Sequence, residues 1–538
     1  MKLNNRELQN PDPWRRAGIE LPQFNRGEMI RRTLKQPTWV HFGAGNIFRA
    51  FPANLEQELL NSGAETTGIL AAEGYDGEII RKIYRPHDDL SLLVTLKPDG
   101  SISKRVIGSV AQSLIADGTS PGDFDRLKSI FSSPSLQMAS FTITEKGYRV
   151  SRADGSLLPD VKQDLKGGPD SQKSYLGRVM ALIYTRYLAG KLPLALVSMD
   201  NCSHNGDRLR DAAFRFAREW AAFGLADAGF PGYLADRSKI SFPWSMIDKI
   251  TPRPDSGVAQ KLKQCGFLDA DTIVTEKHTY CAPFVNSEEP QYLVIEDWFP
   301  NGRPRLEKSG VIFTSRETVD KAEKMKVSTC LNPLHTSLAI FGCLLSYKKI
   351  CDEMKDDDLR RLAEGIGYTE GLPAVVSPGI LDPKAFLDEV LHDRLPNPFM
   401  PDTPQRIATD TSQKLSVRFG ETIKTYLKRK DLSIGNLHLI PLVLAGWCRY
   451  LMGVDDSGKP FAVSPDPLSG SLSSGLQKIH LGDKGPFHTV LAPILSNETI
   501  FGVDLYRAGL GETVEHDFSR LVAGPQAVRK TLHAAVSG

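Results

Sequence analysis

A short apolar strand that ends in a glycine turn constrains the fold of this chain more than any other feature. Trp39-Val-His-Phe runs directly into Gly43-Ala-Gly45, and an amphipathic helix follows to about Ser62. In this context the first glycine permits a tight turn and the second lets the backbone approach a pyrophosphate. The N–H groups at the helix start, from Asn46 onward, then face the anion. We therefore expect a Rossmann-type unit in which Gly43, Gly45 and Asn46 bind a dinucleotide.

Two more residues near this turn belong to the predicted dinucleotide site. Phe48 stands where the third glycine of the fingerprint is expected, so the helix and the strand must pack differently there. Glu73 follows the next apolar run, residues 68–72, and is placed to accept hydrogen bonds from the adenosine ribose, which favours NAD over NADP. Its distance from the glycines exceeds the usual spacing of about 20 residues. A solvated glutamate at a strand end is therefore the alternative interpretation.

The character of the chain changes near residue 322. Before it, short apolar runs at 92–96, 105–110, 138–144 and 194–199 alternate with helical segments, and Lys97-Pro-Asp-Gly100 indicates a hairpin. After it, helical periodicity dominates residues 333–348, 352–365, 384–393, 405–428 and 436–452, with a proline-rich connector at 395–404. We expect an α/β Rossmann-type domain over residues 1–322, with residues 1–36 as an extension on its surface. A mainly α-helical C-terminal domain is expected over residues 323–538.

The composition excludes several classes of function. A net charge of +2 over 538 residues gives no reason to expect nucleic acid or an anionic membrane as partner. No apolar run approaches the length of a membrane span, and the first residues lack the apolar core of a signal peptide. The seven cysteines are scattered without paired spacing, which argues against disulfides and against a zinc site. We expect a cytoplasmic protein with reduced thiols and no metal.

Lys326, Asn332 and His335 lie within ten residues at a predicted helix start. Asn332 is expected to cap this helix and Pro333 to occupy its first position. The apolar residues that follow at helical spacing are expected to be buried: Leu334, Leu338, Phe341 and Leu345. A buried lysine among polar groups can act as an acid or base near neutrality. The alternative interpretation is an ordinary capped helix with a core histidine.

Further polar segments occur in a specific order along the chain. They contain Asn201 (residues 198–206), Asp248 (242–252), and Arg406 with Lys414 (406–414). Alone, each is better explained by structure than by function: a turn or cap near Asn201, an ion pair at Asp248, and a solvated helix face for Arg406 and Lys414. Together, from about residue 39 to about residue 467, they resemble the mannitol dehydrogenase family of long-chain polyol dehydrogenases. Residues 292–299, 302–304 and 444–455 support this resemblance.

The resemblance implies a metal-independent active site in which a lysine is the general acid and base. Asn332 and His335 match the family spacing, and would stabilise the oxyanion and orient the substrate respectively. The family lysine usually lies five residues before the asparagine, where this chain has Val327. Lys326 is one position earlier and Lys324 is a further candidate. A one-residue bulge before the helix would bring Lys326 into place.

The same resemblance assigns the remaining candidates. Lys326 would donate the proton when a ketone is reduced, and Asn201 would be a second donor to the oxyanion. Asp248 would tune the lysine or hold a substrate hydroxyl. Arg406 and Lys414 match family positions that reach the substrate from the C-terminal domain.

The implied reaction is NAD-dependent interconversion of a keto-sugar, or its acid, with the corresponding polyol or aldonate. The variant around Asn332 is closest to the hexuronate branch of the family, so we expect fructuronate to be reduced to mannonate. Tagaturonate reduction and mannitol oxidation are the alternatives. A non-catalytic nucleotide-binding protein on the same fold is a third possibility, and a zinc-dependent dehydrogenase is disfavoured because no Cys/His cluster has ligand spacing. The family leans towards a monomer.

Overall fold

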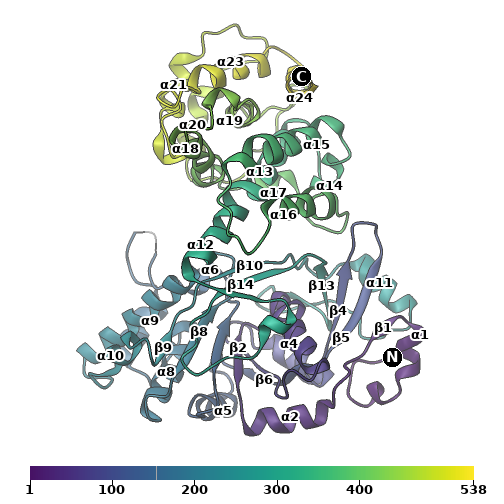
Figure 1. Cartoon of the computed structure of the whole chain (residues 1–538), viewed down its shortest axis with the longest axis vertical. Helices are drawn as coiled ribbons and strands as arrows, with labels where there is room; N and C mark the ends of the chain where they lie inside the picture. Colours follow the sequence, from purple (N-terminus) through teal and green to yellow (C-terminus); the bar gives the residue numbers. More distant parts are fainter. Residues whose placement is uncertain (153, 538) are drawn as a thin grey trace. The chain divides into compact units, whose positions relative to one another are not determined.

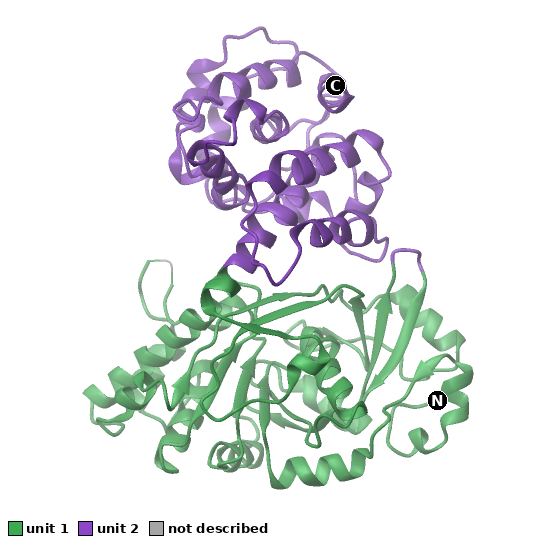
Figure 2. Ribbon diagram, viewed as in Figure 1, with its two compact units in different colours: residues 1–97, 101–320 green, residues 98–100, 321–538 purple. Residues whose placement is uncertain are grey.

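The computed structural model describes residues 1–152 and 154–537, and it divides into two compact units (Figure 2). Unit 1 comprises residues 1–97 and 101–320, and unit 2 comprises residues 98–100 and 321–538. The division after residue 320 lies close to the expected boundary after residue 322. The two units are described separately below.

Unit 1 is built on a six-stranded sheet in which every neighbouring pair is parallel. The strand order is β6 (Val110–Ile115), β3 (Ile69–Glu73), β2 (Trp39–Phe42), β7 (Met138–Phe141), β8 (Leu194–Ser198) and β9 (Ile240–Ser241). The chain starts at β2, builds outward through β3 and β6, then returns to add β7, β8 and β9 on the other side. This doubly wound order confirms the expected Rossmann-type fold, and its direction reverses between β2 and β7.

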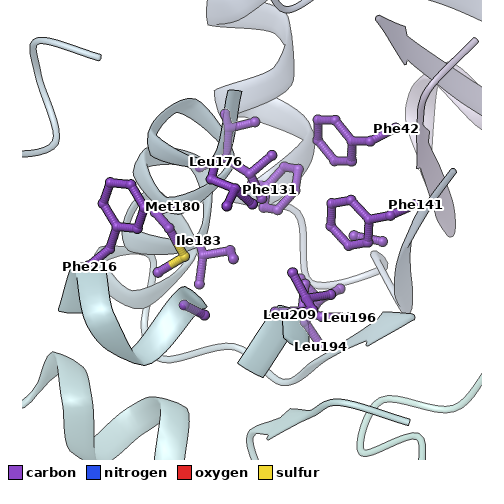
Figure 3. Close-up of a cluster of buried hydrophobic side chains, with 14 of the residues drawn as sticks. Phe42, Phe131, Phe141, Leu176, Met180, Ile183, Leu194, Leu196, Leu209 and Phe216 are labelled. Carbon is purple, nitrogen blue, oxygen red and sulfur yellow. The ribbon is translucent and has the colours of Figure 1, made fainter. Parts of the chain in front are cut away.

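Helices cover both faces of this sheet, which is why its strands are short apolar runs (Figure 1). On one face Phe42 and Phe141 stack with ring centroids 5.2 Å apart, and Phe131 packs against Phe42 (Figure 3). The helices that contribute to this core are α5 (Pro121–Phe131), α7 (Pro159–Gly167), α8 (Tyr175–Leu188), α9 (Asn205–Ala222) and α10 (Phe230–Ala235). The core of the opposite face includes side chains of α3 (Asn46–Ala50) and α4 (Pro52–Asn61).

Smaller sheets complete unit 1. The predicted hairpin is confirmed as β4 (Ser91–Leu96) antiparallel to β5 (Ile102–Ile107), in a sheet with β1 (Ile19–Glu20) and β13 (Phe284–Glu288). A second sheet joins β10 (Ser245–Asp248), β14 (Tyr292–Glu296) and β15 (Ile312–Thr314), and β11 (Ile273–Val274) pairs with β12 (Tyr280–Cys281). The remaining helices are α1 (Pro11–Arg16), α2 (Arg26–Lys35), α6 (Thr144–Gly147) and α11 (Ser256–Gln264).

The first 36 residues are more deeply integrated than the sequence suggested. β1 pairs with β5 in parallel, and the side chain of Trp14 is fully buried. The N-terminal ammonium donates to the carbonyl oxygen of Gly266 at 2.7 Å. Residues 1–36 are therefore part of unit 1 and not only an extension on its surface, because Trp14 and β1 supply contacts that composition alone does not reveal.

Unit 2 is mainly helical, as expected. Its α-helices are α13 (Asn332–Leu344), α14 (Ile350–Glu353), α15 (Asp357–Glu364), α16 (Pro383–Glu389), α17 (Pro404–Ile407), α18 (Glu421–Lys428), α19 (Leu439–Tyr450), α20 (Ser469–Leu476), α21 (His488–Leu495), α22 (Glu498–Phe501), α23 (Gly511–Leu521) and α24 (Ala527–Ser537). The predicted helix over residues 405–428 is interrupted. Asp410 takes a left-handed backbone (φ 54°) and donates its N–H to the carbonyl oxygen of Pro465 at 2.9 Å, so the helix breaks there.

A helical stretch runs through α12 (Arg316–Met325) and a π-helical turn, Lys326–Cys330, into α13. Over Arg316–Leu344 it is long and apolar enough to pass for a membrane span, but 83% of its most apolar window is buried inside the protein. A core helix meets the same test, so this stretch does not indicate a membrane protein.

Candidate active site

The glycine turn after β2 has the geometry of a nucleotide cradle. Gly43 has φ +105°, and a Cβ atom on it would lie 2.2 Å from the carbonyl oxygen of Thr142 at the end of β7. Only glycine fits such a position. Gly45 precedes α3 in an extended conformation, and a Cβ there would meet nothing within 4 Å. Backbone N–H groups and open space thus occur together where the strand order reverses, which fits a dinucleotide pyrophosphate.

Glu73 holds this turn in place from the end of β3. Its carboxylate accepts hydrogen bonds from the N–H groups of Ala44 (2.8 Å), Tyr75 (2.7 Å) and Asp76 (3.0 Å). The side chain is 5% exposed, and burial raises the pKa of the carboxyl although the three N–H groups act in the opposite direction. Glu73 therefore braces the cradle. This corrects both the expected ribose contact and the solvated alternative, because neither describes a carboxylate buried among backbone donors.

The side chain of Phe48 belongs to the core of unit 1. It is fully buried and stacks on His41 of β2, with ring centroids 4.2 Å apart. This corrects its expected place at the cofactor, where only its backbone remains available. Asn46 starts α3, and its side-chain oxygen accepts a hydrogen bond from Arg49 at 2.8 Å. Arg49 in turn donates to the carbonyl oxygen of Ala282, so this contact anchors the first turn of α3.

Asn201 lies in the loop at the carboxyl end of β8. The preceding Asp200 fixes this loop by accepting two backbone N–H bonds, each 2.9 Å long, from the segment after β7. Asn205 ties the loop to β10, because its side-chain oxygen accepts from the N–H of Ser245 at 3.0 Å. Asp248 ends β10 and is buried. The structure therefore places Asn201 and Asp248 on connected elements of unit 1.

The π-helical turn supplies the bulge that the lysine spacing required. The carbonyl oxygen of Lys326 accepts from the N–H of Leu331, five residues on, at 3.1 Å. Such a turn holds one residue more than an α-helical turn and is frequent at functional sites. Lys326 is 2% exposed, whereas Lys324 is exposed. The bulge is confirmed, and the preference for Lys326 over Lys324 as acid and base stays a prediction.

Asn332 does not cap its helix, contrary to expectation. Leu331 occupies the cap position, no side chain caps the helix, and Asn332 is the first helical residue. The reason is the π-helical turn, which runs almost directly into α13 and leaves little of a free helix start. Among residues 1–152 and 154–537 the Asn332 amide has no hydrogen-bond partner, so its donor and its acceptor both remain for a ligand. Of the four predicted buried positions, Leu334, Leu338 and Phe341 are confirmed, whereas Leu345 lies just past the end of α13 and is only half-buried.

His335 belongs to a polar cluster with a residue that the sequence did not single out. Its Nε2 atom lies 3.3 Å from a carboxylate oxygen of Asp402, and the other oxygen of Asp402 accepts from Arg406. Asp402 is 5% exposed and stands two residues before α17. It was missed because it lies in the proline-rich connector. The available signal was its position four residues before Arg406, where an acid pairs with a base along a helix.

Three cations gather on the same part of unit 2. Arg418 donates to the Thr336 hydroxyl beside His335, and Lys414 donates to the Thr409 carbonyl oxygen. Burial lowers the pKa of Arg418 to about 10 and lowers that of Arg406. Burial, together with the charge of Arg418, also lowers the pKa of Lys414. We name Arg406, Lys414 and Arg418 the cation cluster. An anionic ligand bound beside these three side chains would favour their charged forms.

No group of three His, Cys, Asp or Glu side chains in the described part of the chain is arranged to hold a metal ion.

The candidate residues form two sets, one in each unit. Unit 1 carries the glycine turn, Asn201 and Asp248, and unit 2 carries Lys326, Asn332, His335 and the cation cluster.

Comparison with known proteins gives these sets a context. Residues 37–308 match the mannitol dehydrogenase Rossmann domain, and residues 318–522 match the mannitol dehydrogenase C-terminal domain. The chain is 53% identical to the D-mannonate oxidoreductase of Thermotoga maritima, over all of this chain and 99% of that protein. It is 30% identical to the D-mannonate oxidoreductase of Escherichia coli, over 80% of this chain and 82% of that one.

A solved structure agrees. The ternary complex of Pseudomonas fluorescens mannitol 2-dehydrogenase with NAD and D-mannitol is 26% identical, with a TM-score of 0.71 over the whole of both chains. The fold, the two matched domains and the full-length relative coincide, and the chain belongs to the mannitol dehydrogenase family.

Proposed function

We propose that this protein is an NAD-dependent oxidoreductase that interconverts D-fructuronate and D-mannonate. The observation that carries the substrate assignment is the cation cluster of unit 2. Lys414 and Arg418 are half-buried and burial acts against their charged forms, whereas Arg406 is exposed and already paired with Asp402. A substrate carboxylate offers the countercharge, whereas a neutral polyol does not. The full-length similarity to a D-mannonate oxidoreductase supports the same choice.

The glycine turn is proposed to hold the pyrophosphate of NAD. The open space beside Gly45 and the requirement for glycine at position 43 both fit a pyrophosphate. When bound, the nicotinamide supplies the hydride that reduces the ketone. The carbonyl oxygen then gains negative charge, which must be stabilised and neutralised by a proton.

The residues of the chain provide for that charge. Lys326 donates a proton to the developing alkoxide, and in the oxidative direction its neutral amine removes the hydroxyl proton. In unit 2 the amide nitrogen of Asn332 donates a hydrogen bond to that oxygen, and the family resemblance assigns Asn201 of unit 1 as a further donor. His335, held by Asp402, orients a substrate hydroxyl, and Asp248 holds a further polar group. A donor to such an oxyanion typically contributes about 100- to 1,000-fold in rate.

An NADH-oxidation assay with fructuronate, tagaturonate, fructose and xylulose tests the proposal. We expect fructuronate to have the highest kcat/KM, at least about 100-fold above fructose, because a charged hydrogen bond to a carboxylate contributes about 1.5–3 kcal/mol per contact. Preference for fructose would favour the mannitol 2-dehydrogenase alternative. If no ketone were reduced, the non-catalytic alternative would replace this proposal.

We also keep a monomeric state and a cytoplasmic location as proposals. The family resemblance supports the first and the relatives' metabolic roles support the second. Sedimentation of the purified chain tests the monomer, since a mass near twice 59.4 kDa would exclude it.

A further inference from the structure

A cavity of about 480 Å³ opens in unit 1 near the carboxyl ends of three strands. Gly74 and Tyr75 follow β3, Asp117 follows β6 and Lys146 comes after β7; all four line it, together with the start of α8. A dinucleotide whose pyrophosphate lies at the glycine turn after β2 extends its adenosine half over the next strand, which is β3. The cavity therefore stands where the adenosine ribose arrives, an argument that rests on the proposed function.

The end of β3 presents no carboxylate to that ribose. Glu73 is buried and its oxygens accept hydrogen bonds from three backbone N–H groups. At Gly74 a Cβ atom would lie 1.7 Å from a ring carbon of Tyr175, so this position has no room for a side chain. An acid at this point normally binds the ribose 2′-hydroxyl of NAD, and it also repels a 2′-phosphate. That repulsion is missing here.

The charged side chains that line the cavity are mostly cationic. Five of its side chains are lysines or arginines, and two are aspartates. Lys277 donates to the carbonyl oxygen of Tyr75, and its ammonium lies 4.9 Å from the centre of the Tyr75 ring. The ammonium is therefore held beside Tyr75, which follows Glu73 by two residues. One of the aspartates, Asp117, already accepts hydrogen bonds from the N–H (2.8 Å) and the hydroxyl (2.6 Å) of Thr119.

We infer that this cavity accepts a phosphate on the adenosine 2′ position, so that the enzyme uses NADPH as well as NADH. A phosphate monoester carries up to two negative charges, and lysine and arginine are its usual partners. The inference comes from the missing carboxylate at β3 and the fixed ammonium of Lys277, which are independent features of the same cavity.

A binding measurement tests this without any substrate. Titration calorimetry of the full-length protein would compare adenosine 2′,5′-bisphosphate with adenosine 5′-monophosphate, and inorganic phosphate would serve as the probe for the anion alone. We expect the 2′-phosphate to tighten binding by at least about tenfold, which corresponds to about 1.4 kcal/mol. Equal or weaker binding of the bisphosphate would overturn the inference.

Single substitutions test whether Lys277 contacts the 2′-phosphate. Lys277→Ala should lower kcat/KM for NADPH about tenfold and leave that for NADH unchanged, and it should lower the affinity for the bisphosphate equally. Lys308→Ala is the matched control, because Lys308 is also an exposed lysine of unit 1 but lies outside the cavity. Equal losses with both cofactors would refute the assignment to the 2′ position. If the bisphosphate binds as expected but fructuronate is not reduced with either cofactor, the proposed function fails while the assignment of a 2′-phosphate site to this cavity stands.

Discussion

At the scale of single residues, Lys326 carries the clearest expectation. Lys326 is buried at the start of a π-helical turn, whereas Lys324 is exposed two residues earlier. Replacing Lys326 by alanine removes the proposed proton donor, so we expect kcat for fructuronate to fall by about 10²- to 10⁴-fold. Lys324→Ala is the matched control and should keep its activity. Full activity of the Lys326→Ala enzyme, measured by NADH oxidation, would exclude this lysine as the acid and base.

Lys414 gives an expectation about pH. Because burial and the charge of Arg418 lower its pKa, it loses its proton at a lower pH than an ordinary lysine. Raising the pH therefore removes a positive charge from the cation cluster, and we expect KM for fructuronate to increase in alkaline solution. KM for a neutral ketose should stay constant over the same range. Identical trends for both substrates would show that Lys414 does not face the carboxylate.

The site residues were predictable from the sequence to different degrees. Asn332 and His335 were proposed from their spacing and stay predictions as site residues, and the structure brings His335 together with Arg406 through Asp402. The roles of Glu73 and Phe48 were not predictable. Both depend on what the side chain meets in three dimensions, namely three backbone donors for Glu73 and the ring of His41 for Phe48.

At the scale of elements, the contact between α14 and α13 contains a buried acid. Within the described residues both oxygens of Glu353 lack a hydrogen-bond partner, and burial raises the pKa of this carboxyl well above its usual range. It fits there because α13 has a glycine opposite: a Cβ on Gly342 would lie 2.1 Å from a Glu353 oxygen. Burial and the missing hydrogen-bond partners therefore favour the protonated form of this carboxyl in the folded state.

This protonation predicts how stability depends on pH. The unfolded chain ionises Glu353 near its ordinary pKa of about 4.3, so above that pH the folded state binds more protons than the unfolded one. The free energy of unfolding then falls as the pH rises, by up to about 1.4 kcal/mol per pH unit from this group. Glu353→Gln removes the dependence, and we expect its gain in Tm over the unmodified protein to grow between pH 5 and pH 8.

A matched variant controls this experiment. Glu512→Gln changes an exposed glutamate at the start of α23, and its effect on Tm should not vary over the same pH range. Thermal melts at several pH values measure both variants. A gain for Glu353→Gln that is constant with pH would mean that the Glu353 carboxyl is ionised in the folded protein.

The helices and strands were largely predictable where burial requires a recognisable pattern of apolar residues. The apolar runs at β2, β3, β7 and β8 were recognised because strands covered on both faces need apolar residues throughout. The second strand of the hairpin was displaced by three residues, and β6 was not separated from it. The π-helical turn and the break at Asp410 depend on single backbone hydrogen bonds, which hydrophobic periodicity does not record.

At the scale of the whole molecule, the nucleotide cradle and most of the proposed substrate residues belong to different units, and only Asn201 and Asp248 join the cradle in unit 1. The nucleotide cradle and its bracing glutamate belong to unit 1, and the cation cluster with Lys326, Asn332 and His335 belongs to unit 2. Each unit has its own buried hydrophobic side chains, and each matches its own family domain. A cofactor and a sugar acid should therefore leave separate footprints on the chain.

Hydrogen exchange of backbone amides, read by mass spectrometry on the full-length protein, detects such footprints. NADH alone should slow exchange in residues 42–52 and 73–76, because the glycine turn and the Glu73 brace are ordered together. D-Mannonate alone should slow exchange in residues 326–336 and 402–418 of unit 2 and, through Asn201 and Asp248, in residues 198–206 and 245–248 of unit 1. Stabilisation by a ligand at 100 times its Kd amounts to about 2.7 kcal/mol, which is ample for detection.

Two glycine substitutions distinguish a specific loss of the nucleotide site from a general effect of backbone strain. Gly43→Ala places a Cβ 2.2 Å from the Thr142 carbonyl oxygen, so we expect it to abolish the NADH footprint and to leave the mannonate footprint in unit 2. Gly310→Ala imposes a similar positive φ (+93°) in open space, so it causes the backbone strain without the clash. It should therefore retain both footprints. Loss of the NADH footprint in both variants would attribute it to the stability of unit 1, and retention in both would place the pyrophosphate away from the turn after β2.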